Sequence, residues 1–159
     1  MSFEIRKAVN TDCSLILEFI TDLAEYEKLQ HEVTATTEQI GQTLFNKNPA
    51  AEVYLGFENE VAAGFALIFH NYSTFLAKPG IWLEDLFVKE EFRGKGYGKR
   101  LLAFLANLAI ERNCGRLEWS VLNWNKPTIK FYKNLGAIAM QDWTTYRLTK
   151  DELKKLARA

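Results

Sequence analysis

The sequence predicts an α/β (α+β) fold, on three observations. Short apolar runs rich in β-branched and aromatic residues alternate with segments whose apolar residues recur at helical spacing. A glycine-rich turn joins one of the apolar runs directly to a helical segment. Along the chain, the predicted order is strand, two helices, three strands, helix, strand, helix and two strands, followed by a terminal helix or frayed tail.

The N-terminal part begins with a predicted strand at residues 3–8, where apolar and polar residues alternate. Residues 10–12, Asn-Thr-Asp, can cap the helix that follows. The apolar side of that helix carries Leu15, Ile16, Phe19, Ile20, Leu23 and Ala24. A break is expected at residues 29–33. Thr37 is then predicted to cap a second helix that runs to Phe45.

The middle of the chain contains three predicted strands. Residues 52–58 and 61–69 form a hairpin with a short turn at Asn59. Residues 72–80 contain turn residues and a proline, and are predicted to form a loop. The third strand covers residues 82–88. It leads through the glycine-rich turn into a helix with Leu101, Leu102, Leu105, Leu108 and Ala109 at helical spacing.

The C-terminal part follows a helix stop at residues 113–115. Residues 116–121 are predicted to form a strand. Pro127 is suited to the first turn of a short helix, and Gly136 is suited to its end. Two closing strands are expected at 137–140 and 145–148, and residues 150–159 are expected to form a helix or a frayed tail.

The length and composition indicate one domain that covers residues 1–159, because 159 residues with 48% apolar side chains can bury a sizeable core. The formal net charge is zero, with 20 basic and 20 acidic residues. This balance gives no indication of binding to nucleic acid or to an anionic membrane surface. A partner must therefore be inferred from local features.

The rarer residue types indicate a soluble, cytoplasmic and metal-free protein. Cys13 and Cys114 are the two cysteines, and the start of the chain has no secretory apolar region, which suits a reducing cytosol. No apolar segment is long enough to span a membrane. His31 and His70 are too isolated in sequence to indicate a metal site.

The glycine-rich turn reads Arg93-Gly94-Lys95-Gly96-Tyr97-Gly98-Lys99. Glycines can adopt positive φ, and the start of a helix offers free N–H groups and a favourable dipole to an anion such as phosphate. The spacing matches neither a Walker A loop nor the dinucleotide-binding fingerprint. A glycine loop that merely connects two elements, and an RNA-binding Arg/Gly segment, are the alternatives.

Three stretches extend this observation to a family. Arg93-x-x-Gly96-x-Gly98, preceded by Leu83-Glu84-Asp85, resembles the signature of the GNAT superfamily of N-acetyltransferases. The stretch from Trp124 to Ala137 and residues 12–27 are similar to segments of the spermidine/spermine N-acetyltransferase family. The resemblance implies the GNAT fold, a mixed and curved central sheet with helices on both faces.

The resemblance also implies acetyl-CoA as cosubstrate and a role for each motif residue. Glu84 would act as the base through a water molecule, and Tyr132 would donate to the coenzyme A sulfur. The strand at Leu86, Phe87 and Val88 would splay at a bulge and offer backbone groups to the cofactor. Residues 93–99 would hold the pyrophosphate and Asn125 the cofactor arm. Taken singly, Asn125 could instead form an Asx turn, Tyr132 a core contact and Glu84 a surface carboxylate.

The resemblance further implies a small basic amine as the substrate, a diamine, polyamine or lysine-like amine. Tyr26, Glu27, Glu84 and Asp85 are the residues it assigns to the amine. Polyamine-specific members have an aspartate where this chain has Ser73, so residues 71–75 and 24–29 look more like the thialysine acetyltransferase branch. Asp142 is a candidate to compensate.

The family resemblance implies a homodimer as well, with the closing strands near the partner. Two alternative functions stay open at this point. One is acetylation of a protein amine, and the other is acyl-CoA binding without turnover, as a sensor module.

Overall fold

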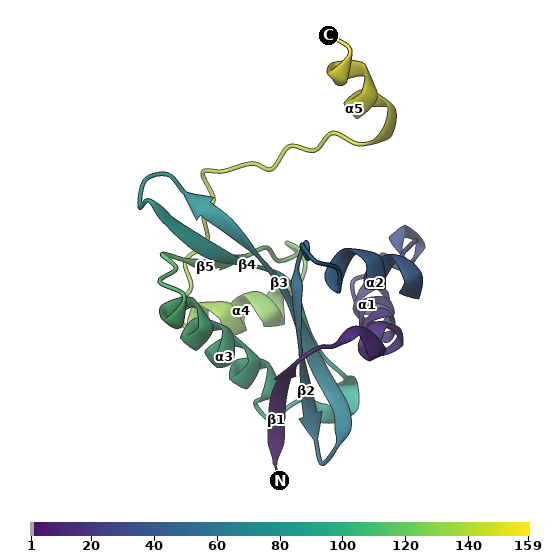
Figure 1. Cartoon of the computed structure of the whole chain (residues 1–159). Coiled ribbons are helices and arrows are strands. Elements are labelled where there is room, and N and C mark those ends of the chain that lie inside the picture. Colours follow the sequence, from purple (N-terminus) through teal and green to yellow (C-terminus); the bar gives the residue numbers. More distant parts are fainter. Residues whose placement is uncertain (1) are drawn as a thin grey trace. The chain divides into compact units, whose positions relative to one another are not determined.

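The computed structural model describes residues 2–159 and divides them into two compact units. The first unit extends to Leu122, and the second comprises Asn123–Ala159. Figure 1 shows the elements of both. The sequence-based assignment of a single domain to residues 1–159 stays a prediction.

A mixed five-stranded sheet forms the centre of the first unit, in the order β1-β2-β3-β4-β5. The first four strands are antiparallel to their neighbours, and β5 is parallel to β4. The strands are β1 (Phe3–Lys7), β2 (Glu52–Glu58), β3 (Val61–Ser73), β4 (Lys78–Val88) and β5 (Leu117–Trp119). The mixed sheet that the family resemblance implied is therefore confirmed.

Helices cover both faces of this sheet (Figure 1). On one face lie α1 (Cys13–Tyr26) and α2 (Thr37–Leu44), and on the other lies α3 (Tyr97–Glu111). Three 3-10 turns, η1 (Asn10–Asp12), η2 (Gln30–Glu32) and η3 (Glu90–Phe92), link the helices and strands. The sheet with helices on both faces agrees with the predicted fold class.

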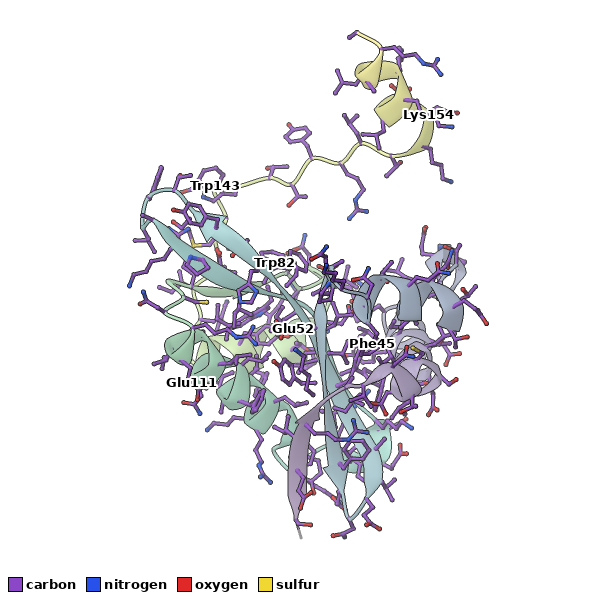
Figure 2. The ribbon with its side chains drawn as sticks, viewed as in Figure 1. Phe45, Glu52, Trp82, Glu111, Trp143 and Lys154 are labelled. Carbon is purple, nitrogen blue, oxygen red and sulfur yellow. The ribbon has the colours of Figure 1, made fainter. Side chains whose placement is uncertain are left out.

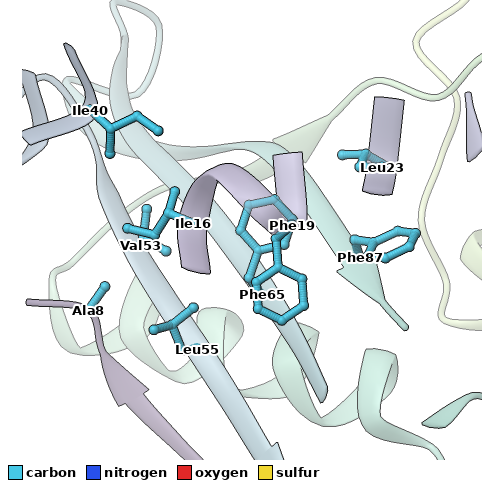
Figure 3. Close-up of a cluster of buried hydrophobic side chains, with 9 residues drawn as sticks. All are labelled: Ala8, Ile16, Phe19, Leu23, Ile40, Val53, Leu55, Phe65 and Phe87. Atoms are coloured by element: carbon cyan, nitrogen blue, oxygen red, sulfur yellow. The ribbon is translucent and has the colours of Figure 1, made fainter. Parts of the chain in front are cut away.

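The main core lies between α1, α2 and the sheet (Figure 3). Its centre is the stacked pair Phe19 and Phe65, whose ring centroids are 5.0 Å apart. The buried members are Ala8, Ile16, Phe19, Leu23, Ile40, Val53, Leu55, Phe65 and Phe87. Burying each large apolar side chain contributes about 1.5–3 kcal/mol, so this cluster holds α1 against the sheet.

A second cluster on the opposite face attaches α3. It contains Phe3, Ala63, Tyr97 and Leu101. The rings of Phe3 and Tyr97 stack with centroids 4.0 Å apart. Because Tyr97 is the first residue of α3, this contact locates the start of the helix on the sheet.

Asp12 and Thr36 precede the N-terminal ends of α1 and α2. Asp12 accepts a hydrogen bond from the Val9 N–H at 2.8 Å and pairs with Arg6, whose guanidinium lowers the pKa of the carboxyl. The cap of α2 is Thr36 and not the predicted Thr37. Thr36 has extended backbone, and its oxygen accepts the Gln39 N–H at 3.2 Å while the Gln39 side chain accepts the Thr36 N–H at 3.0 Å.

The predicted loop at residues 72–80 is wrong, because β3 continues to Ser73 and β4 begins at Lys78. Only residues 74–77 form the turn. Pro79 lies near the start of β4, where a missing N–H is tolerated, and its carbonyl accepts the Gly115 N–H at 2.9 Å. The hairpin of β3 and β4 is consequently longer than the sequence pattern indicated.

The second unit contains the helices α4 (Lys126–Asn134) and α5 (Lys150–Ala157). Pro127 lies in the first turn of α4, and Gly136 follows the helix with φ of 88°, as predicted. The predicted strands at 137–140 and 145–148 are wrong, since the structure forms no ladder at these described residues. The predicted strand at 116–121 is shorter, because only Leu117–Trp119 find partners in β4.

Among residues 2–159, no helix combines the length and apolar character needed to cross a lipid bilayer.

Candidate active site

The glycine-rich turn has the backbone geometry that its sequence predicted. Gly94 and Gly96 have φ of 76° and 81°, in the left-handed region that favours glycine. A Cβ atom at either position would meet no heavy atom within 4 Å. The turn is therefore open on the side where these glycines lack a side chain, and a ligand can approach the backbone there.

Free N–H groups follow at the start of α3. The first hydrogen bond within the helix joins the Arg100 N–H to the Gly96 carbonyl at 3.0 Å. The N–H groups of Tyr97, Gly98 and Lys99 precede that bond, and no side chain caps them in the described residues. Together with the helix dipole they form an anion cradle that suits a phosphate or diphosphate group.

The side chains of the turn mainly anchor it to the sheet. Arg93 donates from Nε to the Val88 carbonyl at 2.9 Å, and its guanidinium lies over the rings of Tyr26 and Phe87. Lys95 forms an ion pair with Glu58. Tyr97 is buried, so only its backbone faces the open side, whereas Lys99 is exposed.

β4 loses its β5 neighbour after Leu83, ten residues before the turn begins at Arg93. The two strands pair over Ile81–Leu83, and β4 then continues to Val88. A bulge marks the same position, because Leu83 pairs with Ile68 and Asp85 pairs with Leu67, which leaves Glu84 as the extra residue. The edge of β4 that includes Leu86, Phe87 and Val88 is thus open on the side away from β3.

Three carboxylates gather at this bulge. Burial raises the pKa of Asp85 to about 6, and the charges of Glu84 and Glu27 contribute to the increase. Burial, and then the charge of Glu84, also raises the pKa of Glu27, which caps the C-terminal end of α1. Such crowding of negative charge is costly unless a cation is bound, and it is typical of a site for a basic ligand.

Glu27 and Asp85 line a hollow of about 340 Å³ between α1, the segment that follows it, and β4. The rest of its wall is largely apolar. The lining residues are Ile20, Leu23, Ala24, Glu27, Leu29, Glu32, Val33, Thr34, Ala35 and Asp85. A hollow with a largely apolar wall and three carboxylates, those of Glu27, Glu32 and Asp85, fits an alkyl chain that carries a positive charge.

Glu84 itself is exposed and accepts a hydrogen bond from Trp82 Nε1 at 2.9 Å. Trp82 is labelled in Figure 2. Tyr26 lies 6.4 Å from the ring of Phe87, centroid to centroid, at the end of α1. The structure thus brings together Tyr26, Glu27, Glu84 and Asp85, the four residues that the sequence assigned to the amine.

In the second unit, Asn125 and Tyr132 belong to α4. Asn125 caps the helix, and its carbonyl accepts the Ile129 N–H at 3.0 Å. The ring of Tyr132 lies 5.6 Å from that of Phe131. Asp142 lies in an exposed turn. The roles assigned to these residues stay predictions.

Comparison with known proteins connects these features to a family. The family model described as acetyltransferase (GNAT) family matches residues 16–137. This chain belongs to the GNAT family. The matched residues include α1 from Ile16 onward, strands β2 to β5, the glycine-rich turn and α4, and the match makes the protein an acetyltransferase.

Relatives of this GNAT acetyltransferase act on amines. The chain is 33% identical to an L-ornithine N5-acetyltransferase of Arabidopsis thaliana, over 98% of this chain and 88% of the relative. It is 34% identical to a thialysine N-epsilon-acetyltransferase of Sus scrofa, over 96% of both chains. Among solved structures, an integron cassette protein from the mobile metagenome of V. cholerae matches with a TM-score of 0.82 and 30% identity, over 100% of this chain and 99% of that one.

Two residues of the candidate site were not found from the sequence. Glu58 binds Lys95 and Tyr97 of the turn, and Trp82 binds Glu84. Glu58 carries a weak signal, since it is one of two glutamates that begin and end a strand of otherwise uncharged residues, the other being Glu52. Its partners are 37 and 39 positions away, so no local pattern could identify them. In the described residues, no three His, Cys, Asp or Glu side chains are grouped as a metal site.

Proposed function

We propose that this acetyltransferase transfers the acetyl group of acetyl-CoA to a primary amine of a small basic substrate, which is a diamine, a polyamine or a lysine-like amine such as thialysine. The observation that carries the proposal is the group of three carboxylates, Glu27, Glu84 and Asp85, at the bulge of the strand that leads into the anion cradle. A cation site at this bulge and a phosphate site at the turn that follows β4 match the two substrates of such a reaction.

The residues present fit acetyl-CoA. The N–H groups at the start of α3 would hold the diphosphate, and the open glycines at 94 and 96 would let it approach the backbone. Leu86, Phe87 and Val88 would bind the extended arm of the cofactor through the open edge of β4, as an added strand does. Asn125 would bind the same arm. When bound, acetyl-CoA supplies an activated thioester.

The carboxylates would select a basic amine. Asp85 and Glu27 would pair with the positive charge that lies away from the reacting nitrogen, and Tyr26 would contact the alkyl chain beside them. Ornithine and thialysine, which the names of the two curated relatives contain, both carry a second amine. We extend that substrate class to this chain.

Glu84 would act as the general base of the reaction, and Tyr132 as the general acid. An aliphatic amine with a pKa near ~10 is charged at neutral pH and must lose a proton before it attacks. Glu84 would accept that proton through a water molecule. Tyr132 would donate to the sulfur as the bond to carbon breaks, since a phenol is a weaker acid than a thiol and transfer must be concerted.

We propose direct transfer within a ternary complex. Cys13 begins α1 and Cys114 follows α3, and neither lies among the residues of the site. Both are free thiols, which suits the proposed location in a reducing cytoplasm. The amine nitrogen would therefore form its bond to the acetyl carbon without a covalent enzyme intermediate.

We also propose that the protein is a homodimer. Large apolar side chains are exposed along the second unit, namely Ile138, Met140, Trp143, Tyr146, Leu148, Leu153 and Leu156. A second copy of the chain would cover this surface, as the family resemblance implies.

A screen of amines tests the proposed activity. The purified protein is incubated with acetyl-CoA and single amines, and the released thiol is measured. Diamines and lysine-like amines should release thiol faster than monoamines of equal length, because only they can pair with Asp85 and Glu27. Acetylation of proteins in preference to free amines would replace the proposed substrate, and binding of acetyl-CoA without thiol release for any amine would indicate a sensor module.

Initial rates with both substrates varied test the route of transfer. Direct transfer gives intersecting lines in double-reciprocal plots. Parallel lines would show an acetyl-enzyme and contradict the proposal.

A further inference from the structure

Glu58 is a buried carboxylate to which no part of the proposed reaction assigns a role. It is the last residue of β2 and lies in register opposite Phe3 of β1 and Val61 of β3. Only 7% of its surface is exposed. Because a carboxylate is rarely buried without partners, the groups around it show what it does.

Both partners of Glu58 come from the glycine-rich turn. Lys95 Nζ donates to the two carboxylate oxygens, at 2.9 Å each. The Tyr97 hydroxyl donates to Oε2 of the same carboxylate. The Tyr97 hydroxyl and the Lys95 ammonium lower the pKa of Glu58, so the carboxylate is charged at neutral pH.

Lys95 and Tyr97 flank Gly96, the residue that begins the anion cradle. Gly94 and Gly96 have no Cβ and open space around them, so packing of their own cannot keep the turn in one conformation. The side chains beside these glycines hold the turn instead, Arg93 through the Val88 carbonyl, and Lys95 and Tyr97 through Glu58. Tyr97 is stacked on Phe3 and bound to Glu58, and Lys95 is bound to Glu58.

The ion pair between Lys95 and Glu58 also determines which group of Lys95 can bind a phosphate. Its ammonium is engaged with Glu58 and lies 5.4 Å from the centre of the Phe92 ring. Lys95 would therefore face a phosphate through its backbone N–H, while its side chain anchors the turn.

We propose that Glu58 is a positioning residue for the cofactor: by binding Lys95 and Tyr97, it holds the turn in the conformation that directs the backbone N–H groups of residues 94–99 toward a diphosphate. This inference rests on the proposed use of acetyl-CoA. It assigns to Glu58 an effect on cofactor affinity and none on the chemical step.

Isothermal titration of Glu58→Gln with coenzyme A tests the proposal. The loss of the ion pair should raise the Kd for coenzyme A about tenfold, and KM for the amine should stay within about twofold. If the Lys95 ammonium bound the phosphate directly, the same substitution would release it and tighten binding. A Kd that falls or does not change overturns the proposal.

Glu52→Gln is the matched control. Glu52 lies on the same strand and forms an equivalent pair with the same helix, through Arg112 beyond its C-terminal end, at 2.7 and 2.9 Å. This variant should lose stability while the Kd for coenzyme A stays within about twofold. An equal loss of affinity in both variants would show general weakening of α3 and would also overturn the proposal.

Hydrogen exchange of the protein without ligand separates the inference from the proposed function. The amides of Arg93 and Arg100, which are bonded to the Glu90 and Gly96 carbonyls at the two ends of the turn, should exchange about tenfold faster in Glu58→Gln and at the wild-type rate in Glu52→Gln. Unchanged exchange in Glu58→Gln refutes the positioning role whether or not coenzyme A binds. Wild-type protein that binds no coenzyme A would refute the proposed function instead, because the exchange result does not depend on it.

Tyr97→Phe provides a second variant if Glu58→Gln does not fold. It removes the hydroxyl donor and keeps the ring that stacks on Phe3. Its Kd for coenzyme A and its exchange rates should change in the same direction as expected for Glu58→Gln, by about threefold. Wild-type values in Tyr97→Phe would count against the proposal.

Discussion

Asp85 has a pKa that is raised toward neutrality. Burial and the neighbouring charges of Glu84 and Glu27 raise its pKa to about 6. The folded protein therefore holds a proton that the unfolded chain loses near the ordinary aspartate pKa of 3.8. In the absence of a cation, Asp85 makes the fold less stable as pH rises through this interval. A bound amine would reverse this effect, because its positive charge stabilises the carboxylate.

The first prediction concerns the pH dependence of amine binding. KM for a diamine should increase as pH falls below about 6, because Asp85 becomes protonated and can no longer pair with the cation. Asp85→Asn should raise KM at pH 7 about tenfold and remove this pH dependence. Initial rates between pH 5 and 8 check both points, with KM for acetyl-CoA as the internal control. An unaltered pH profile in Asp85→Asn would assign the titration to another group.

Glu84 carries the second prediction. Glu84→Gln should lower kcat about a hundredfold at neutral pH, and more at low pH, because a smaller fraction of the amine is then deprotonated and the variant lacks a base to remove the proton. Steady-state rates from pH 6 to 9 measure the change. Glu4→Gln, an exposed strand carboxylate on β1, is the control and should behave like wild type. Equal loss at every pH would argue for a role other than proton acceptance.

The third prediction concerns Tyr132. Tyr132→Phe removes the phenol and should lower kcat/KM about tenfold with a good amine substrate, since the departing thiolate loses its donor. The ring and its contact with Phe131 are retained. Unchanged kcat/KM would show that the assignment of Tyr132 as the acid is wrong.

At the level of elements, an ionic network joins α3 to two strands. Arg112, the residue after α3, binds both oxygens of Glu52 on β2, and Lys7 of β1 pairs with the same carboxylate at 3.0 Å. Glu52 is labelled in Figure 2. The hydrogen bonds from Arg112, and then those from Lys7, lower the pKa of Glu52 to about 2.

This network gives the fourth prediction, on acid stability. Glu52 has a lower pKa in the folded protein than in the unfolded chain. Its contribution to the free energy of unfolding is therefore complete above pH 4.5 and is lost as pH falls from 4.5 to about 2. After allowance for partial exposure, the loss should be about 2 kcal/mol. Urea unfolding from pH 2 to 7 measures it. In Glu52→Gln this part of the acid loss should be absent, and a wild-type acid profile would contradict the assignment.

Some helices and strands could be predicted from the sequence pattern alone, and others could not. Helical spacing predicted α1 and α3, and Pro127 with Gly136 predicted α4, because these signals are local to each helix. The start of β4 was missed, because Pro79 and the neighbouring turn residues suggested a loop. Pairing with Tyr72 and the other residues of β3 overrides that local preference. The prediction of closing strands at 137–140 and 145–148 was wrong for the opposite reason. Their local sequence favours a strand, but a strand forms only where the edge of another strand is available for pairing.

For the whole molecule, the exposed apolar side chains of the second unit lead to the fifth prediction. Sedimentation equilibrium should give a mass of twice that of one chain. A variant with Trp143→Ser and Tyr146→Ser should shift the equilibrium toward the monomer, because it removes two side chains that are 76% and 93% exposed. A monomer at micromolar concentration in the wild type would contradict the proposed dimer.

The sequence by itself determined the class of fold, the family and the conformation of the turn at Gly94 and Gly96. These properties follow from local patterns, namely helical periodicity, the spacing of glycines and a motif of a few consecutive residues. Only the tertiary structure decided that Asp85 is half-buried near the charge of Glu27, that β5 leaves β4 at Leu83, and that Glu58 binds Lys95 and Tyr97 of the turn. The physical reason is distance along the chain: burial, charge interaction and strand pairing depend on residues far apart in sequence, and folding brings them together.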